Sequence, residues 1–235
     1  MKKTFLTLAT SLLALLAVSS VSAVDITVEN AAGKQLVPQN PQRVVVLDFS
    51  AVDSVRALGE KNKIVGLAKS VNIPDYLSEF KSENYVNLGS LKEPDFEKIN
   101  DLNPDLIIAT TRQKKVINRL KEIAPVFYMH TDYTKLYESF QQNVNALGQI
   151  FSKQDIAKEK LANLEQRMKS LAEKTKGKTA LVTLVNESKV SVYGDVSRYA
   201  VVYNNFGFTP ADNAIKSSFY SRHECWIRIY SGKKS

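Results

Sequence analysis

The chain has 235 residues, and its 32 lysines and arginines exceed its 24 aspartates and glutamates, which gives a formal net charge of +8 at pH 7. This mild basic excess suits an anionic small ligand or an anionic surface, and no basic run with interleaved aromatic residues indicates nucleic-acid binding. A single cysteine excludes an intramolecular disulfide.

The first 23 residues have the pattern of a cleavable signal peptide. Lys2 and Lys3 precede an apolar stretch over residues 5–18, and small residues follow at positions 21–23, where a signal peptidase cuts. A transmembrane helix is the alternative, but the stretch is short for a span and is interrupted by hydroxyl-bearing residues. We therefore expect residues 1–23 to be removed and the rest to be exported.

Short apolar strands alternate with helices over residues 24–134. A hairpin is expected first, with Ala32-Gly33 as its turn. Uninterrupted apolar runs are typical of strands that are covered on both faces. Such runs occur at residues 44–47, 64–67, 106–108 and 126–129, and the helices expected between them include residues 48–59, 76–80 and 94–102. This alternation predicts an α/β lobe, with a parallel sheet and helices on both faces.

An arginine follows one of these strands. In the segment of residues 103–113, an Asn-Pro turn leads into the strand at 106–108, and helical spacing resumes at Val116. In open α/β sheets the ligand crevice lies beyond the carboxyl ends of the strands, where Arg112 falls. A cation near the start of a helix opposes the helix macrodipole, so we expect a ligand anion to offset the charge of Arg112.

The pattern changes over residues 135–176. Apolar residues keep helical spacing there, apart from a break at Ser152-Lys153. We expect this segment to be a rigid helical connector between two lobes, with little freedom at the hinge.

Residues 177–218 begin a second, partial α/β lobe. A strand pair is expected at 180–185 and 189–193, followed by a helix that Gly207 ends. Arg198 repeats the arrangement of Arg112, since it follows a strand and a loop and precedes a helix. Two such arginines, one in each lobe, would face each other across a cleft.

Four segments carry a family resemblance. They are NPQRVVVLD at 40–48, VNLGSLKEPDFEKINDLNPDLIIATTRQ at 86–113, LKEIAPVFYM at 120–129 and VYGDVSRYAVVYNNFGF at 192–208. The chain resembles the periplasmic ferric-siderophore binding proteins of ABC importers, in the Fe/B12 periplasmic-binding family and close to its catecholate, enterobactin-type branch. The resemblance implies two lobes with parallel sheets, joined by a long connector helix, that clamp an anionic iron complex. It implies that Arg112 and Arg198 bind this ligand.

The resemblance also implies the biological setting. The protein would be periplasmic, monomeric and non-enzymatic, with no cofactor and no catalytic or metal-ligating residues. It would deliver a ferric siderophore to an inner-membrane ABC permease. Iron held by three catecholates is multiply negative, and guanidinium groups, which stay protonated, suit such a ligand.

Other functions stay open as alternatives. The chain could be a non-binding remnant, or it could use the same fold to bind cobalamin, haem or a metal ion, although paired arginines argue against a neutral or cationic ligand. A bare-iron site would draw on the cluster of residues 128–133, which we interpret as a strand end and a polar loop. No GxSxG motif occurs, and we interpret Asp48 and the Asp95/Glu97 pair as a loop residue and helix-start charges, not as acid–base groups.

The resemblance stops near Ser218, and residues 219–235 form an aberrant tail. This tail holds the only cysteine and the only tryptophan of the chain. Shifting the reading frame by one nucleotide can encode a string like the family's next segment, so we hypothesise a frameshift that leaves the second lobe incomplete. A divergent terminus is the alternative, and sequencing the gene decides between the two. An incomplete lobe would leave apolar faces over residues 181–185 and 201–206 uncovered.

Overall fold

The computed structural model describes residues 24–70, 72–186 and 189–215. The expected signal peptide and the expected tail lie outside these ranges. Within these ranges, no helix combines the length and the apolar character needed to cross a membrane.

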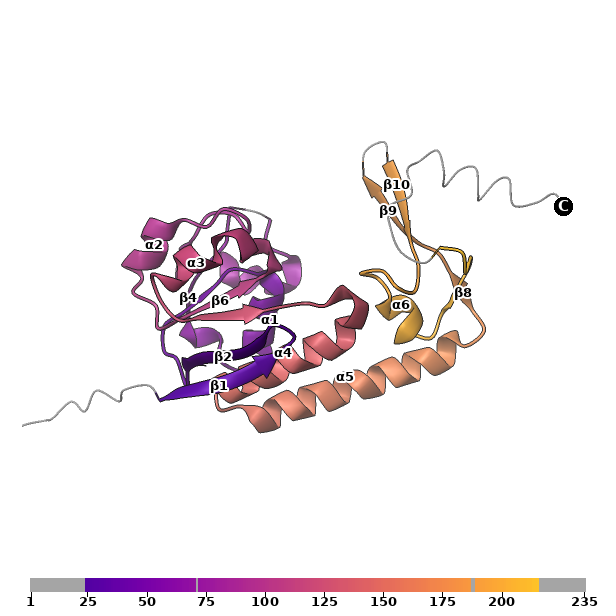
Figure 1. Cartoon of the computed structure of the whole chain (residues 1–235), viewed down its shortest axis with the longest axis horizontal. Coiled ribbons are helices and arrows are strands. Elements are labelled where there is room, and N and C mark those ends of the chain that lie inside the picture. Colours follow the sequence, from indigo (N-terminus) through magenta and orange to yellow (C-terminus); the bar gives the residue numbers. More distant parts are fainter. Residues whose placement is uncertain (1–23, 71, 187–188, 216–235) are drawn as a thin grey trace, which may run out of the picture.

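Two lobes are joined by one long helix, α5 (Gln154–Thr175), as Figure 1 shows. We use "first lobe" for residues 24–153 and "second lobe" for residues 179–215. The α/β architecture predicted from the sequence is confirmed, since strands and helices alternate through the first lobe.

A five-stranded parallel sheet forms the centre of the first lobe, in the order β5-β4-β3-β6-β7. Its strands are β3 (Val44–Val46), β4 (Ile64–Leu67), β5 (Val86–Asn87), β6 (Leu106–Thr110) and β7 (Val126–Met129). Successive side chains of a strand point to opposite faces. Leu106 and Ile108 pack in one apolar cluster, and Ile107 and Ala109 pack in the other. Both faces are buried, which explains the uninterrupted apolar runs.

Helices cover both faces of this sheet (Figure 1). One face carries α1 (Phe49–Ala57) and α4 (Leu136–Ile150), and the other carries α2 (Phe96–Asp101) and α3 (Ile117–Lys121). Short 3₁₀ turns complete the connections: η1 (Lys61–Lys63), η2 (Asp75–Lys81), η3 (Thr111–Val116) and η4 (Tyr133–Lys135). Helix α2 begins after Asp95, whose side chain accepts a hydrogen bond from the Lys98 amide at 3.2 Å, so the predicted start at Pro94 is two residues early.

The hairpin of β1 (Asp25–Asn30) and β2 (Gly33–Pro38) turns one residue earlier than predicted. Its turn is Ala31-Ala32, because Gly33 already pairs with Asn30 in the ladder. Gly33 has φ +93°, a left-handed conformation that glycine adopts without steric cost. The Asn30 side chain also accepts a hydrogen bond from the Ala32 amide at 2.9 Å, which closes the turn.

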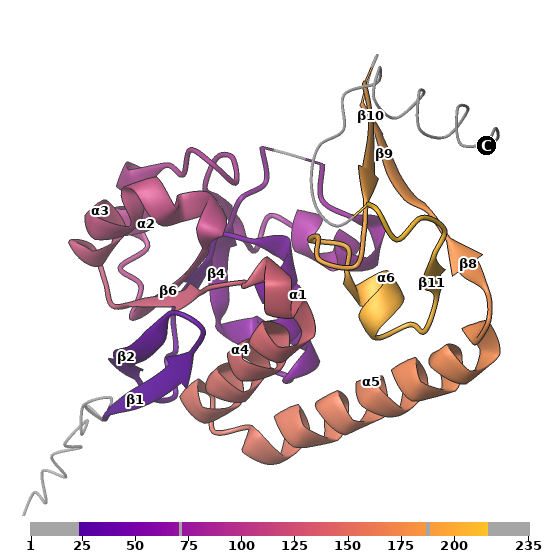
Figure 2. The same ribbon diagram turned by 45° about the vertical axis from the view of Figure 1, so that its right-hand side comes forward.

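The helical segment expected as one connector is two antiparallel helices. Helix α4 ends at Ile150, the chain reverses through Ser152 (φ +53°), and α5 runs back beneath it (Figures 1 and 2). Val144 and Leu147 of α4 pack in the core of the first lobe. Of these two helices, α5 alone extends from the first lobe to the second.

The second lobe contains a hairpin, a small parallel pair of strands and a short helix. The hairpin of β9 (Val182–Asn186) and β10 (Lys189–Tyr193) confirms the predicted strand pair, although its first strand starts at Val182 and not at residue 180. β8 (Thr179–Ala180) pairs in parallel with β11 (Thr209–Pro210), and α6 (Val201–Asn204) is shorter than the helix predicted there.

The second lobe contacts α5 through the loop after α6. A Cβ atom on Gly207 would lie 2.7 Å from Cα of Ala172, so only glycine allows this approach. Within residues 181–185, the side chains of Leu181, Leu184 and Val185 are exposed and that of Val182 is half-buried.

Candidate functional site

Arg112 lies at the carboxyl edge of the sheet, where the sequence placed it. Strand β6 ends at Thr110, and the 3₁₀ turn η3 starts immediately, with α3 following only at Ile117. The Thr110 hydroxyl accepts a hydrogen bond from the Arg112 amide, and the Thr110 amide donates to Gln113 Oε1 at 2.8 Å. This reciprocal capping fixes the backbone on both sides of Arg112.

The charge of Arg112 is offset within the first lobe. Its Nε lies 3.2 Å from Oδ2 of Asp48, whose side chain is 13% exposed, whereas the arginine side chain is 52% exposed. Asp48 follows β3, the parallel neighbour of β6, so the two residues meet at adjacent strand ends. A ligand anion is therefore not required to balance Arg112, which corrects the electrostatic expectation from the sequence.

Asp48 has a second role as the N-cap of α1. Its Oδ1 accepts hydrogen bonds from the amide and the hydroxyl of Ser50, at 2.9 and 2.5 Å. We interpreted Asp48 from the sequence as a loop residue, and that interpretation missed its role as an N-cap. One carboxylate thus caps a core helix with one oxygen and pairs with a candidate ligand-binding arginine through the other.

The buried side chain of Gln113 connects three segments at this edge of the sheet through hydrogen bonds. It is 1% exposed, and its Nε2 donates to the backbone oxygens of Leu47, at 3.1 Å, and of Leu91. These bonds join the end of β3, the loop before α2 and the turn η3. The Thr-x-x-Gln spacing at 110–113 is a capping-box signal that the sequence contained and that our sequence interpretation did not use.

Arg198 follows β10 and precedes α6, so the predicted order of strand, loop, arginine and helix is confirmed. Its Nη2 donates to the Tyr193 hydroxyl at 2.9 Å. Its guanidinium carbon lies 5.2 Å from the ring centre of Tyr193 and 5.1 Å from that of Tyr199. No salt bridge of Arg198 falls within the described residues, so aromatic faces and a hydroxyl hold this cation.

Phenol groups from both lobes affect the pKa of Arg198. The pKa of Arg198 is raised mainly by its hydrogen bond with Tyr193, and also by the Tyr199, Tyr193 and Tyr133 phenols. Tyr133 belongs to the loop after β7, at the same sheet edge as Arg112. That the two guanidinium groups face each other across a cleft stays a prediction.

The cluster of residues 128–133, which we interpreted from the sequence as a strand end and a polar loop, lies beside this edge. Tyr128 and His130 stack with ring centres 5.9 Å apart, and the Tyr128 hydroxyl and His130 Nδ1 are buried without a hydrogen-bond partner in the described structure. Burial, and secondarily Tyr133, raises the pKa of the Tyr128 phenol. The stacking of the two rings agrees with a packing role for this cluster.

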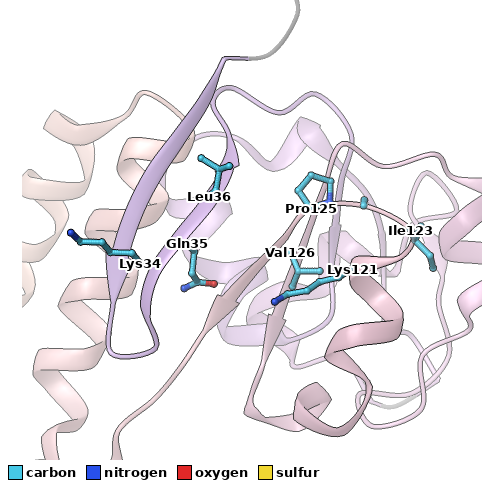
Figure 3. Close-up of a pocket in the computed structure, with 8 residues that line it drawn as sticks. Lys34, Gln35, Leu36, Lys121, Ile123, Pro125 and Val126 are labelled. Atoms are coloured by element: carbon cyan, nitrogen blue, oxygen red, sulfur yellow. The ribbon is translucent and has the colours of Figure 1, made fainter.

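A cavity of about 570 Å³ lies at the opposite end of the sheet (Figure 3). It opens between β2 and the start of β7, where Gln35 and Val126 lie on its two sides. Gln35 bridges these strands, since its side-chain amide donates to the Tyr128 carbonyl at 3.1 Å and accepts from the Tyr128 amide at 2.7 Å. Neither candidate arginine lines this cavity.

Comparison with known proteins identifies the family. The model of the periplasmic binding protein family matches residues 44–223. The chain belongs to this family. The family predicted from the sequence is therefore confirmed, and the matched region contains both Arg112 and Arg198.

Among similar family members, the petrobactin-binding protein YclQ of Bacillus subtilis is 42% identical over 189 residues, which cover 79% of this chain and 59% of YclQ. The ferric-anguibactin-binding protein FatB of Vibrio anguillarum is 29% identical over 204 residues, covering 84% and 62%. The chain thus spans about three-fifths of the length of these relatives.

Solved structures in the family share the fold. The crystal structure of YclQ has a TM-score of 0.78 and 41% identity, covering 84% of this chain and 70% of that one. The periplasmic catecholate-siderophore binding protein VctP of Vibrio cholerae has a TM-score of 0.76 and 31% identity, covering 84% and 71%.

Proposed function

We propose that this chain captures a ferric siderophore of the catecholate type for uptake by an ABC importer. The observation that carries the proposal is that Arg112 and Arg198 each follow a strand on a loop braced by hydrogen bonds. Similarity to the petrobactin-binding protein YclQ and the catecholate-siderophore binding protein VctP supports this ligand class. A multiply anionic complex matches two cations that do not lose their protons.

The proposal includes a setting and a partner. The protein acts in the periplasm as a monomer after removal of residues 1–23, and it hands its ligand to an inner-membrane permease. It catalyses no reaction, because its role is to bind and release. The first lobe and the second lobe contribute one arginine each.

The test is a titration of the Arg112→Ala and Arg198→Ala variants with a ferric tris-catecholate complex. Binding is measured as quenching of intrinsic fluorescence. Hydrogen bonds to charged groups are worth about 1.5–3 kcal/mol, so each variant should lose roughly tenfold or more in affinity. Circular dichroism run alongside establishes that each variant is folded.

Arg119→Ala is the matched control. Arg119 also has its guanidinium over an aromatic ring, 3.8 Å from the ring centre of Phe96, but it lies in α3, which leads to the opposite edge of the sheet. Its removal should leave affinity unchanged. Equal losses in all three variants would indicate nonspecific attraction, and tighter binding of cobalamin or haem than of the catecholate complex would replace the proposed ligand. No binding by folded wild-type chain would identify a non-binding remnant.

A further inference from the structure

The loop that carries Arg198 is rigidly braced. The Ser197 hydroxyl donates to the Gly194 carbonyl at 2.7 Å and accepts from the Tyr199 amide at 3.2 Å. The Ala200 amide donates to the Ser197 carbonyl at 2.9 Å. Ser197 is 6% exposed, so these bonds are shielded from water. The backbone is therefore fixed on both sides of Arg198 before any ligand arrives.

The tyrosine beneath the guanidinium is itself anchored. Tyr193 is 4% exposed and ends β10, and its carbonyl accepts a hydrogen bond from the Tyr203 hydroxyl at 2.9 Å. That hydroxyl in turn accepts from the Val182 amide at 3.2 Å. The rings of Tyr193 and Tyr199 meet edge to face, with centres 4.7 Å apart. The two rings thus form a corner next to the Arg198 guanidinium.

This corner holds the cation without neutralising it. A carboxylate, such as Asp48 beside Arg112, removes the net charge that a ligand anion would meet. A phenol oxygen and two aromatic faces restrain a guanidinium and leave its unit charge in place. Restraint before binding reduces the entropy that is lost on binding.

We propose that Tyr193 is a positioning residue that holds the Arg198 guanidinium, through its hydroxyl, in the orientation that receives the ligand anion. The inference rests on the proposed function, because it concerns how the candidate ligand-binding arginine is prepared. Tyr199 supplies the second wall of the corner through its ring alone. The hydroxyl of Tyr193 and the hydroxyl of Tyr199 therefore differ in their importance for binding.

The experiment compares Tyr193→Phe with Tyr199→Phe in the full chain. Each change removes one hydroxyl from a ring next to Arg198, but only Tyr193 accepts a hydrogen bond from the guanidinium in the described structure. Releasing one pre-ordered side chain should weaken binding of a ferric tris-catecholate complex roughly two- to tenfold for Tyr193→Phe. Tyr199→Phe keeps the ring and removes a hydroxyl that accepts no hydrogen bond from Arg198 in the described structure, so it should weaken binding less than Tyr193→Phe does.

A double-mutant cycle separates positioning from general support. In an Arg198→Ala background, Tyr193→Phe should cause no further loss, since there is no guanidinium left to hold. A loss of the same size in both backgrounds would overturn the inference, because it would show that Tyr193 supports the lobe and not the arginine.

A second readout needs no ligand. Nitrogen-15 NMR of the arginine side chains should show slow rotation of the Arg198 Nη groups in the wild type and faster rotation in Tyr193→Phe. Unchanged rotation would overturn the inference even if affinity fell. If the wild type does not bind the complex, the proposed function fails, and the NMR comparison alone decides whether Tyr193 holds Arg198.

Discussion

Asp48 joins the fold to the candidate site, and two substitutions separate its roles. One carboxylate oxygen caps α1 through Ser50, and the other pairs with Arg112. Asp48→Ala removes both contacts, whereas Asp48→Asn keeps an N-cap of about equal quality and replaces the charged oxygen that accepts from Arg112 with an amide NH2 group. The pair of variants therefore gives one measurement of the cap and one of the pairing with Arg112.

The expected stabilities follow from these contacts. Loss of an N-cap costs about 0.5–2 kcal/mol, and α1 packs Ala51, Val52 and Val55 into the first-lobe core, so fraying at its start disturbs buried side chains. Asp48→Ala should lower the free energy of unfolding by about 1–2 kcal/mol in urea denaturation. A partly exposed ion pair contributes only about 0.2–1 kcal/mol, so Asp48→Asn should lose less than about 1 kcal/mol.

The expected affinities have the opposite sign. A ligand anion at Arg112 competes with Asp48 for the same guanidinium and is also repelled by that carboxylate. Removing a competitor worth up to about 1 kcal/mol should tighten binding of a ferric tris-catecholate complex by up to about fivefold in Asp48→Asn. The gain should shrink at high salt, because exposed charges are screened.

One result would refute this account. If Asp48→Asn keeps its stability but binds the anionic complex more weakly than the wild type, then Asp48 aids binding by orienting Arg112, and competition is not its main effect. Weaker binding of Asp48→Ala alone would carry no such meaning, since that variant also loses the cap.

Three further predictions concern particular residues of both lobes. Gln113→Ala should lower the free energy of unfolding by about 1–3 kcal/mol in urea, because it strands buried backbone groups at Thr110 and Leu47; a change below about 0.5 kcal/mol would contradict this. Gly207→Ala should destabilise the packing of the second lobe on α5, because the residue has φ +79° and the new Cβ would meet the α5 backbone. The expected result is faster proteolysis of the second lobe, and unchanged proteolysis would contradict the close approach. Burial raises the pKa of the Tyr128 phenol, so folding stability should be intact below about pH 10 and should fall as the pH rises through the raised folded-state pKa. Tyr128→Phe should show a shallower fall in urea denaturation across the alkaline range, and parallel curves would count against the raised pKa.

The sequence predicted the parts of the fold that depend on local pattern. Strands with both faces buried have uninterrupted apolar runs, which made β3, β4, β6 and β7 recognisable. Details decided by single backbone angles were missed. The hairpin turn moved by one residue because Gly33, and not its neighbour Ala32, takes a positive φ and enters the ladder.

The same distinction explains the candidate site. The position of Arg112 after a strand was visible in the sequence, but its partner Asp48 is 64 residues away and becomes a neighbour only because β3 and β6 pair in parallel. Strand order is set by packing of the whole sheet, which spacing in one sequence does not reveal. Similarly, helical spacing predicted that the segment after β7 is helical. It did not reveal that α4 belongs to the first-lobe core, because the burial of Val144 and Leu147 depends on tertiary packing.

The two candidate arginines are prepared in different ways, and this difference has a functional consequence. Arg112 already forms an ion pair with Asp48. A ligand anion therefore gains at Arg112 only the interaction free energy that exceeds that of the existing pair. Arg198 is restrained by Tyr193 and Tyr199, and among the residues that the structure describes no carboxylate forms a salt bridge with it. The second lobe should therefore supply more of the electrostatic attraction, while the first lobe supplies a rigid sheet edge. Binding of a multiply anionic ligand would then be driven mainly by Arg198, while at Arg112 the ligand would replace Asp48 as the partner anion.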